Sequence, residues 1–284
     1  MKKLFIFGTT EIGQSRFADH KISPKFLGGN GIIASLSAAK HIPVSYISVI
    51  GTDIDIDKLS FVLGDAIELT HLTVLDGETF QYIATYDQNT EELIDQKTNF
   101  GVYGEFDPNS SLDIHGESIK AILFSGSKPQ LSSAVLDQLS STSIIGVDVI
   151  MYHLIHNFDA QIQLISKTDI LFCNSREYEC ITQQTSQDLF SYFPNIKVIF
   201  CKRGKKGVSI ITAQNTRTFD ARPGIVPINP TGAGDAFAGT VMSYIAKNNS
   251  LDIPKDVIIN AQDESVKVIM NDRYYRKLFE EVKK

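Results

Sequence analysis

The chain alternates short apolar runs with stretches of helical periodicity. Several of the runs are continuous rather than alternating, and such runs are typical of strands covered on both faces. Helical stretches follow Gly29 and span about 132–139 and 177–190, between the runs. This order of strand and helix predicts an α/β fold with a mostly parallel sheet and helices on both faces. The apolar runs are 4–7, 44–50, 121–124, 144–149, 170–173 and 198–201.

Segment 79–86 departs from this pattern because aromatic or small apolar residues fall at every second position. The alternation predicts a half-exposed strand. Two interpretations of its apolar face stay open. The face covers a bound substrate, or it pairs with a second copy in a homodimer, since exposed strands favour pairing. The face comprises Phe80, Tyr82, Ala84 and Tyr86.

A small antiparallel β flap is expected around that strand. A polar connection at 87–92 leads to 93–100, which is the expected weaker partner strand. We expect about 10–27 to supply the first two strands. The flap is therefore predicted as a lid, formed by about 10–27 and 72–104 and carried by the main domain.

Composition and charge exclude several classes of protein. The chain has 284 residues, 43% of them hydrophobic, and a formal net charge of 27 − 33 = −6. This composition is ordinary for a globular protein, so fibrous, collagenous and wholly disordered classes are excluded. The length allows one large α/β domain or two smaller ones. The mild acidity predicts no nucleic-acid partner, because such binders carry a basic field.

The sequence also predicts no membrane partner. No stretch approaches the ~20 apolar residues of a transmembrane helix, and the first apolar run stops at Gly8, too early for a signal peptide. The three cysteines, Cys173, Cys180 and Cys201, form neither a CxxC pair nor a disulfide framework. We therefore expect a cytoplasmic protein with reduced thiols.

The strongest chemical signal lies at 229–247, NPTGAGDAFAGTVMSYIAK. Pro230 and Gly232 mark a loop, and from about Ala233 the residues take a helical period. A Gly-rich loop leading into a helix exposes backbone N–H groups to a ligand, and the helix dipole favours negative charge there. The segment therefore predicts an anion hole. Asp235, in the first turn, is placed to cap the helix or to accept a proton from a hydroxyl held near the hole.

This segment resembles the second signature of the ribokinase-like (PfkB) carbohydrate kinase family, D/N-P-T-G-A-G-D-x-F-x-G, nearly residue for residue. Four further segments are similar to family motifs and follow the family's order, so the resemblance extends over about 1–250. These segments are the Gly-Gly stretch GGNGIIASLSAA at 28–39, the strand end Gly51-Thr52-Asp53, the N-x-x-E motif NSRE at 174–177 and the hairpin KRGKKGV at 202–208.

The resemblance implies a ribokinase-like three-layer α/β/α sandwich, with 1–284 as a single domain that includes the lid. It implies an enzyme, a kinase that transfers a phosphoryl group from ATP, with Mg²⁺, to a hydroxyl of a sugar, sugar derivative or nucleoside. By position, Asp235 is the general base, while Gly232, Ala233 and Gly234 form the anion hole. Phosphoryl transfer needs positioning and charge stabilisation more than covalent chemistry, which is consistent with these roles.

The resemblance also implies metal, nucleotide and acceptor contacts. Glu177 is the implied metal ligand, because Mg²⁺ keeps waters and phosphates and needs few carboxylates. For Glu177 alone, a solvated carboxylate at a helix start is the other interpretation. The implied nucleotide-binding residues are Asn174, Glu177, Lys202, Gly204, Gly207 and Thr231. The implied acceptor-binding residues are Glu11, Gly28, Gly29, Asn30 and Asp235.

The acceptor side departs from the family pattern. The first strand lacks the Asp that sugar-binding members carry after its Gly, and Glu11 either substitutes for it or is a surface residue. The Asn that usually follows the Gly-Gly pair is replaced by Ile32 or Ile33, with Asn30 as the polar residue instead. Hydrogen bonds to hydroxyls carry the selectivity of a polyol site. We therefore expect an unusual or more apolar acceptor, such as a nucleoside whose base stacks on Phe or Tyr.

A second hypothesis is a catalytically weak, ligand-binding relative that senses a nucleotide or sugar. It rests on those substitutions and on the short sequence after 229–247, which ends in a charged helix at about 272–284. A truncated adenine pocket is expected there, and the intact GAGD sequence argues against a pure sensor. The candidate residues near the adenine are Asn260, Ala261 and Ser265.

Overall fold

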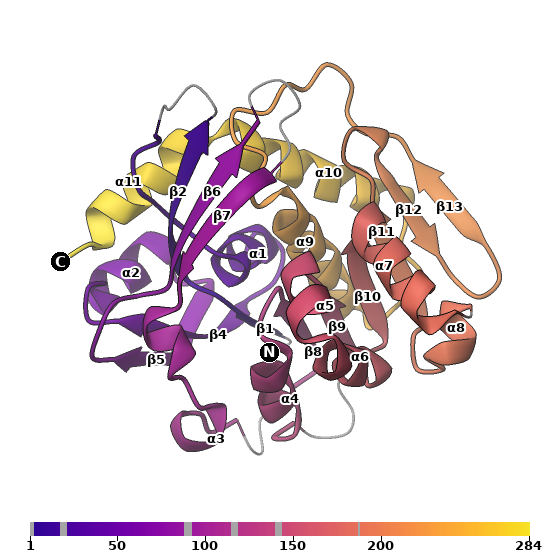
Figure 1. The fold of residues 1–284 in the computed structure, drawn as a ribbon, viewed down its shortest axis with the longest axis horizontal. Helices are drawn as coiled ribbons and strands as arrows, with labels where there is room; N and C mark the ends of the chain where they lie inside the picture. The colour runs from indigo at the N-terminus through magenta and orange to yellow at the C-terminus, as the bar shows by residue number, and fades with distance from the viewer. Residues whose placement is uncertain (1–2, 18–21, 88–92, 115–118, 140–143, 187) are drawn as a thin grey trace.

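The computed structural model describes residues 3–17, 22–87, 93–114, 119–139, 144–186 and 188–284. Within these residues the chain forms a nine-stranded sheet and a four-stranded sheet (Figure 1). The strands of the large sheet are β1 (Leu4–Gly8), β4 (Val44–Gly51), β5 (Ile67–Leu75), β8 (Ala121–Ser125), β9 (Ile144–Asp148), β10 (Ile170–Asn174), β11 (Val198–Lys202), β12 (Val208–Ile211) and β13 (Thr216–Phe219).

The large sheet has the order β13-β12-β11-β10-β9-β8-β1-β4-β5. Neighbouring strands from β5 to β11 are parallel, while β12 and β13 continue the sheet in antiparallel pairing. Each continuous apolar run became a strand of this sheet, and β1 and β8 are buried over their whole length. The expectation of an α/β fold with a mostly parallel sheet is confirmed.

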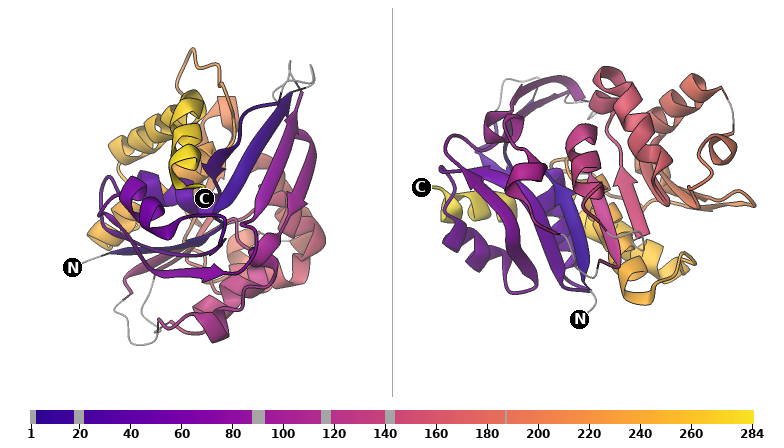
Figure 2. Two further views of the ribbon diagram at one scale, coloured as in Figure 1. Left: turned by 90° about the vertical axis from the view of Figure 1, so that its left-hand side faces the viewer. Right: turned by 90° about the horizontal axis from the view of Figure 1, so that it is seen from below.

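Helices cover both faces of the large sheet. Strand β1 shows why: Leu4 and Ile6 join one buried apolar cluster, and Phe5 and Phe7 join another on the opposite face. The first cluster receives side chains from α1, α2, α9, α10 and α11, and the second from α4 to α8, so the molecule has three layers (Figures 1 and 2). The helices are α1 (Asn30–Ala38), α2 (Ile56–Leu63), α3 (Pro108–Ser111), α4 (Pro129–Leu136), α5 (Met151–His156), α6 (Phe158–Ser166), α7 (Ser175–Thr185), α8 (Leu189–Tyr192), α9 (Ala233–Asn248), α10 (Lys255–Met270) and α11 (Asp272–Val282), with 3₁₀ turns η1 (Gly101–Gly104) and η2 (Gly204–Lys206).

Two predicted helices have different bounds in the structure. Helix α4 begins at Pro129 rather than near residue 132, because proline is favoured at the first position of a helix, where its missing N–H costs no hydrogen bond. The expected helix at 177–190 is split into α7 and α8. Ser186 adopts a left-handed conformation, with φ 51°, and this ends α7.

The small sheet contains β2 (Glu11–Phe17), β3 (Phe26–Gly28), β6 (Gln81–Tyr86) and β7 (Leu93–Asn99), in the order β3-β2-β6-β7. Its two halves are antiparallel hairpins, but β2 and β6 pair in parallel, so the predicted flap is not antiparallel throughout. The predicted lid also began too early, since residues 72–75 belong to β5 of the large sheet. Residues 18–21 and 88–92 of the predicted lid, including most of its polar connection, lie outside the described residues.

The apolar stripe of β6 faces inward where the structure describes it. Ala84 is buried, and the Phe80 ring packs edge-on against Phe100 and Tyr103 with centroids 5.8 and 5.7 Å apart. Tyr82 is half-buried. This part of the stripe therefore packs within the chain, and the side chain of Tyr86 lies outside the described residues.

The C-terminal helix lies against the small sheet rather than beside the nucleotide hairpin. Helix α11 packs on β3 and α2, and Ile54 forms a β-bridge with Lys283 at its end (Figure 2, left). The carboxyl ends of β1 and β8 and the starts of α1 and α9 meet beside the small sheet, and such strand ends are where open α/β sheets place ligands.

Candidate active site

The loop before α9 is held in one conformation by its own side chains. The Thr231 N–H donates to Oδ1 of Asn229 at 3.1 Å, and Gly232 has φ 87° at the N-cap position. A Cβ on Gly232 would lie 2.4 Å from Cδ1 of Ile33, so the position requires glycine. The helix then begins at Ala233, whose first-turn N–H groups have no acceptor within the helix. Gly232, Ala233 and Gly234 therefore form the Gly-rich helix start on which the predicted anion hole depends, and anion binding there stays a prediction.

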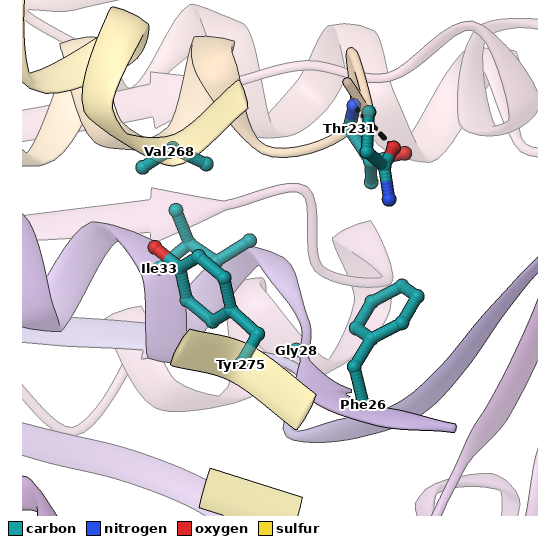
Figure 3. Close-up of a pocket in the computed structure, with 7 residues that line it drawn as sticks. Phe26, Gly28, Ile33, Thr231, Val268 and Tyr275 are labelled. Carbon is teal, nitrogen blue, oxygen red and sulfur yellow. Dashed lines mark hydrogen bonds between the residues drawn. The ribbon is translucent and has the colours of Figure 1, made fainter. Parts of the chain in front are cut away.

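A small apolar cavity lies behind this loop (Figure 3). Ile33 of α1, Val268 of α10 and Tyr275 of α11 form much of its wall, and Figure 3 shows their side chains around it. Thr231, which was expected to bind the nucleotide, lies in this wall. Side chains from three helices therefore lie around the cavity behind the loop.

Asp235 occupies the first turn of α9 and is held by two side chains. Nδ2 of Asn30 donates to its Oδ1 at 2.9 Å, and Oγ of Ser125 lies 3.4 Å from the same oxygen. Asn30 is the first residue of α1 and Ser125 is the last residue of β8. The predicted base and the predicted acceptor residue Asn30 are therefore in direct contact.

Glu11 is buried beside this carboxylate. Its residue exposure is 6%, and its Oε1 lies 3.5 Å from the position of a Cβ built on Gly28. Burial, reinforced by the charge of Asp235, raises the pKa of Glu11 to about 8. The surface interpretation of Glu11 is wrong. Gly28 and Gly29 are also buried, and Gly29, with φ 104°, brings the chain into α1 close to Thr9.

Lys202 lies on the other side of the α9 N-terminus. Its Nζ is 2.6 and 2.7 Å from the two carboxylate oxygens of Asp148, and it is 2.9 Å from the position of a Cβ on Gly234. Burial lowers the pKa of Lys202, but the charges of Asp148 and Glu177 outweigh it and raise that pKa overall. Burial raises the pKa of Asp148 to about 6 although Lys202 opposes the shift. A half-buried cation thus lies beside the predicted anion hole.

Asn174 and Glu177 form a capping box at the start of α7. Oδ1 of Asn174 accepts the Glu177 N–H at 2.9 Å, and Oε2 of Glu177 accepts the Asn174 N–H at 2.7 Å. Oε1 of Glu177 accepts the Met151 N–H at 3.0 Å, which ties α7 to α5. Burial raises the pKa of Glu177 to about 7, against the effect of Lys202. Glu177 is therefore buried, and the interpretation as a solvated carboxylate is wrong.

Few described side chains of the site could ligate a Mg²⁺ ion. Within the described residues no three His, Cys, Asp or Glu side chains are grouped to hold a metal ion. Both oxygens of Glu177 accept backbone N–H groups, yet its carboxylate and that of Asp148 interact electrostatically. Mg²⁺ commonly keeps several waters and is held by one or two carboxylates plus phosphates. This donor set fits a magnesium ion bound largely through water and substrate phosphates.

A cleft of about 960 Å³ begins at the α9 N-terminus and extends along the β11–β12 hairpin. Gly204 and Gly207 line it, both with positive φ, and a Cβ on Gly207 would lie 1.9 Å from the Phe219 carbonyl oxygen. The predicted nucleotide residues Lys202, Gly204 and Gly207 are thus brought together with Ala233 and Gly234. Asn174, Glu177 and Thr231 do not line this cleft in the described part of the chain.

The far end of the cleft is closed by α10 and by residues 220–227. Gln262 lines this end, with Nε2 donating to the Asp220 carbonyl at 2.9 Å. Ser265 lines the cleft at the other end, beside the start of α9, where its Oγ donates to the Ala233 carbonyl at 2.8 Å. Of the other adenine-side candidates, Ala261 is fully buried and Asn260 contacts His41. This end of the cleft therefore has two walls.

Three polar residues of the site were not singled out from the sequence: Thr9, Ser125 and Asp148. Ser125 and Asp148 are the last residues of β8 and β9, and Thr9 follows β1. A polar residue at the carboxyl end of a buried parallel strand is the signal that could have found them, because ligands bind at that edge.

A Gly-rich helix start, a carboxylate in its first turn and a cleft of about 960 Å³ on a three-layer α/β fold are the features expected of a small-molecule kinase. The chain belongs to the pfkB family of carbohydrate kinases, whose family model matches residues 24–253. None of the helices in the described residues has both the length and the apolar character needed to cross a bilayer.

Similar proteins include both nucleoside kinases and ribokinases. The chain is 25% identical over 265 residues to a cytidine kinase of Thermococcus kodakarensis, covering 89% of this chain and 91% of that one. Its fold is similar to a nucleoside kinase of Burkholderia thailandensis in complex with inosine, with TM-score 0.77, 15% identity and 94% and 91% coverage. It is also similar to a putative ribokinase II of Escherichia coli in complex with ATP and Mg²⁺, with TM-score 0.76, 18% identity and 95% and 93% coverage.

Proposed function

We propose that the protein transfers the γ-phosphoryl group of ATP to a hydroxyl of a nucleoside, within the wider class of sugar and nucleoside acceptors. The observation that carries the proposal is the position of Asp235. Its carboxylate lies in the first turn of α9, beside the backbone of Gly232, Ala233 and Gly234, and is oriented by Asn30 and Ser125. A base and an anion-binding helix start are thus adjacent, as transfer to a hydroxyl requires.

In the proposed reaction Asp235 accepts the proton of the acceptor hydroxyl. The hydroxyl oxygen forms a bond to the γ-phosphorus while the bond to the β–γ bridging oxygen breaks, and ADP keeps that electron pair. Backbone N–H groups at the start of α9 stabilise the charge on the transferring group. Lys202, 2.9 Å from the position of a Cβ on Gly234, adds a half-buried positive charge at the same place.

ATP is proposed to occupy the cleft of about 960 Å³, with its phosphates toward Lys202 and Gly234 and its base toward residues 220–225 and Gln262. Gly204 and Gly207 let the hairpin backbone approach it closely. A bound Mg²⁺ would neutralise charge on the phosphates, and Glu177, with Asp148, would hold its water ligands. Asn174 fixes Glu177 in place through the capping box.

The acceptor is proposed to lie between Asp235 and the small sheet, against Glu11, Gly28 and Gly29. Glu11 carries the carboxyl group that the first-strand Asp supplies in sugar-binding members, and it is buried where a ribose hydroxyl would meet it. The cytidine kinase relative and the inosine-bound nucleoside kinase favour a nucleoside within the class.

The test is turnover by wild-type protein and by Asp235→Asn, with ATP, Mg²⁺ and a panel of nucleosides and sugars. We expect phosphorylated product from the wild type and a loss of about 10²-fold or more from the variant, with an unchanged circular dichroism spectrum. Near-normal turnover by Asp235→Asn would contradict the role of the base. Ligand-induced thermal shifts without any turnover across the panel would instead favour the sensor hypothesis.

We propose further that the lid contributes to a homodimer through β7. This strand forms one edge of the small sheet, and Ile94 on it is 59% exposed. Unpaired strand edges favour pairing with another chain. Sedimentation of the wild type should give a dimer mass and Ile94→Lys a monomer; a wild-type monomer at high concentration would contradict this assembly.

A further inference from the structure

The two hydrogen bonds to Asp235 end on the same oxygen. Asn30 Nδ2 and Ser125 Oγ both approach Oδ1, at 2.9 and 3.4 Å. Among the described residues, no hydrogen bond reaches Oδ2. We propose that Asn30 is a positioning residue for Asp235, and that Oδ2 is the oxygen that receives the acceptor proton. This inference rests on the proposed function, since it assigns a task within that reaction.

The orientation of the Asn30 amide is determined by its partners. A carboxylate can only accept hydrogen bonds, so the amide must present Nδ2 to Asp235. The opposite end of the amide, Oδ1, accepts from Oγ1 of Thr9 at 3.2 Å. The Asn30 N–H in turn donates to the same Thr9 hydroxyl oxygen at 3.3 Å. Thr9 therefore fixes both the backbone and the side chain of Asn30.

Packing further limits the conformations that the Asn30 side chain can adopt. Gly126 has φ 57°, and a Cβ at that position would lie 2.6 Å from Cγ and Nδ2 of Asn30. The glycine backbone thus lies directly against the amide. Oγ of Ser125 lies 3.3 Å from the Asn30 carbonyl oxygen, which is the alternative acceptor for its single proton, so the end of β8 contacts both Asn30 and Asp235. The amide is held by the ends of two buried strands, β1 and β8.

This arrangement has a chemical consequence. With Oδ1 anchored, rotation of the carboxylate about its last torsion is restricted, and Oδ2 keeps one direction relative to the α9 N-terminus. A base that must meet a hydroxyl and a phosphorus atom in line gains rate from such positioning, because small misplacements of reacting groups are costly. Asn30 therefore orients the base Asp235, while other groups of the site recognise the acceptor.

A positioning role and an acceptor-binding role for Asn30 predict different kinetics. For Asn30→Ala we expect kcat to fall about 10- to 100-fold, with the KM for acceptor and for ATP changed less than about 3-fold. Thr9→Ala, which leaves the amide in place but frees its orientation, should lower kcat less and also leave KM unchanged. A 10-fold or larger rise in acceptor KM with unchanged kcat would overturn the inference and make Asn30 an acceptor ligand. Asn30→Ser, measured the same way, provides the test if Asn30→Ala does not fold.

A double variant separates this inference from the proposed function. If Asn30 acts through Asp235, adding Asn30→Ala to Asp235→Asn should cost no further activity. An additional loss equal to that of Asn30→Ala alone would overturn the inference while leaving the base assignment intact. If Asp235→Asn alone retains near-normal turnover, the proposed base itself fails, whatever Asn30 does.

Discussion

Asn229 donates a hydrogen bond from Nδ2 to Oγ of Ser15 at 3.2 Å, and this bond joins the loop before α9 to strand β2 of the small sheet. The other end of the Asn229 amide accepts the Thr231 N–H. The Asn229 and Ile228 N–H groups both donate to the Ile269 carbonyl, at 3.1 and 3.0 Å. One asparagine therefore links the anion-binding loop, the lid and, through its backbone, the end of α10.

Removing this link should affect acceptor binding more than folding. Ser15→Ala deletes the hydroxyl that Asn229 contacts but keeps the Asn229–Thr231 bond, so we expect about 1 kcal/mol lower free energy of unfolding. Because β2 borders the proposed acceptor site, the acceptor KM should rise severalfold. Ser209→Ala is the matched control, since its hydroxyl meets Thr218 across the hairpin at 3.3 Å. An equal change of acceptor KM in both variants would contradict a role of the link in acceptor binding.

The contributions of Lys202 and Asp148 to the free energy of unfolding should be strongly coupled. The side chains are 18% and 4% exposed, and removing one partner of a buried pair leaves the other charge uncompensated, which costs about 3–5 kcal/mol. We expect such losses for Lys202→Met and for Asp148→Asn, measured by urea unfolding. The double variant should lose clearly less than the sum. Additive losses would mean that the two residues stabilise the fold independently.

Lys202→Met should also weaken catalysis, because Lys202 lies beside the N-terminus of α9. We expect a higher KM for ATP together with a lower kcat, and an unchanged KM for the acceptor. Lys167→Met, which removes an exposed ion pair with Asp137, should leave all three constants unchanged. A normal ATP KM in Lys202→Met would show that this cation does not contact the nucleotide.

Because of Glu11, the free energy of unfolding should fall as pH rises. Its pKa in the folded protein is about 8, above the ordinary value of 4.5, so the folded state binds the proton more tightly than the unfolded chain. The resulting stabilisation is complete below the ordinary pKa and is lost between that value and about 8, by up to ~1.4 kcal/mol per pH unit. Glu11→Gln carries no such proton, so its free energy of unfolding relative to wild type should increase from about pH 5 to about pH 8. Glu105→Gln, at an exposed position, should follow the wild type. A constant difference between Glu11→Gln and wild type over this range would contradict the buried, proton-binding state.

Local patterns predicted the sheet and the Gly-rich helix start of α9 well, because each depends on residues close together in sequence. Continuous apolar runs specify buried parallel strands, and the Gly-rich loop and the helix after it are contiguous. The Asn30–Asp235 bond joins residues 205 positions apart, and no local pattern encodes such a pair. The parallel pairing of β2 with β6 was missed for the same reason, since these two segments lie far apart in the chain and meet only after folding.

Predictions from residue type alone were wrong where burial determines the role of a residue. A glutamate such as Glu11 is usually exposed, but in the folded chain it is buried with Gly28 close to its carboxyl group. The break between α7 and α8 depends on a left-handed serine, Ser186, a conformation that non-glycine residues adopt rarely and that composition does not signal.

Two glycines of the anion hole should respond differently to alanine. At Gly232, φ is 87° and a Cβ would lie 2.4 Å from Ile33, so Gly232→Ala should lower the free energy of unfolding by a few kcal/mol. Gly234 has helical backbone, where alanine is favoured by about 1 kcal/mol, and its Cβ would meet only the flexible end of Lys202, at 2.9 Å. Gly234→Ala should therefore fold with near-normal stability but raise the KM for ATP, because the methyl group displaces Lys202 and fills space beside the phosphates. Urea unfolding and ATP kinetics on both variants check this contrast. Normal ATP kinetics in Gly234→Ala would show that the phosphates do not approach the first turn of α9.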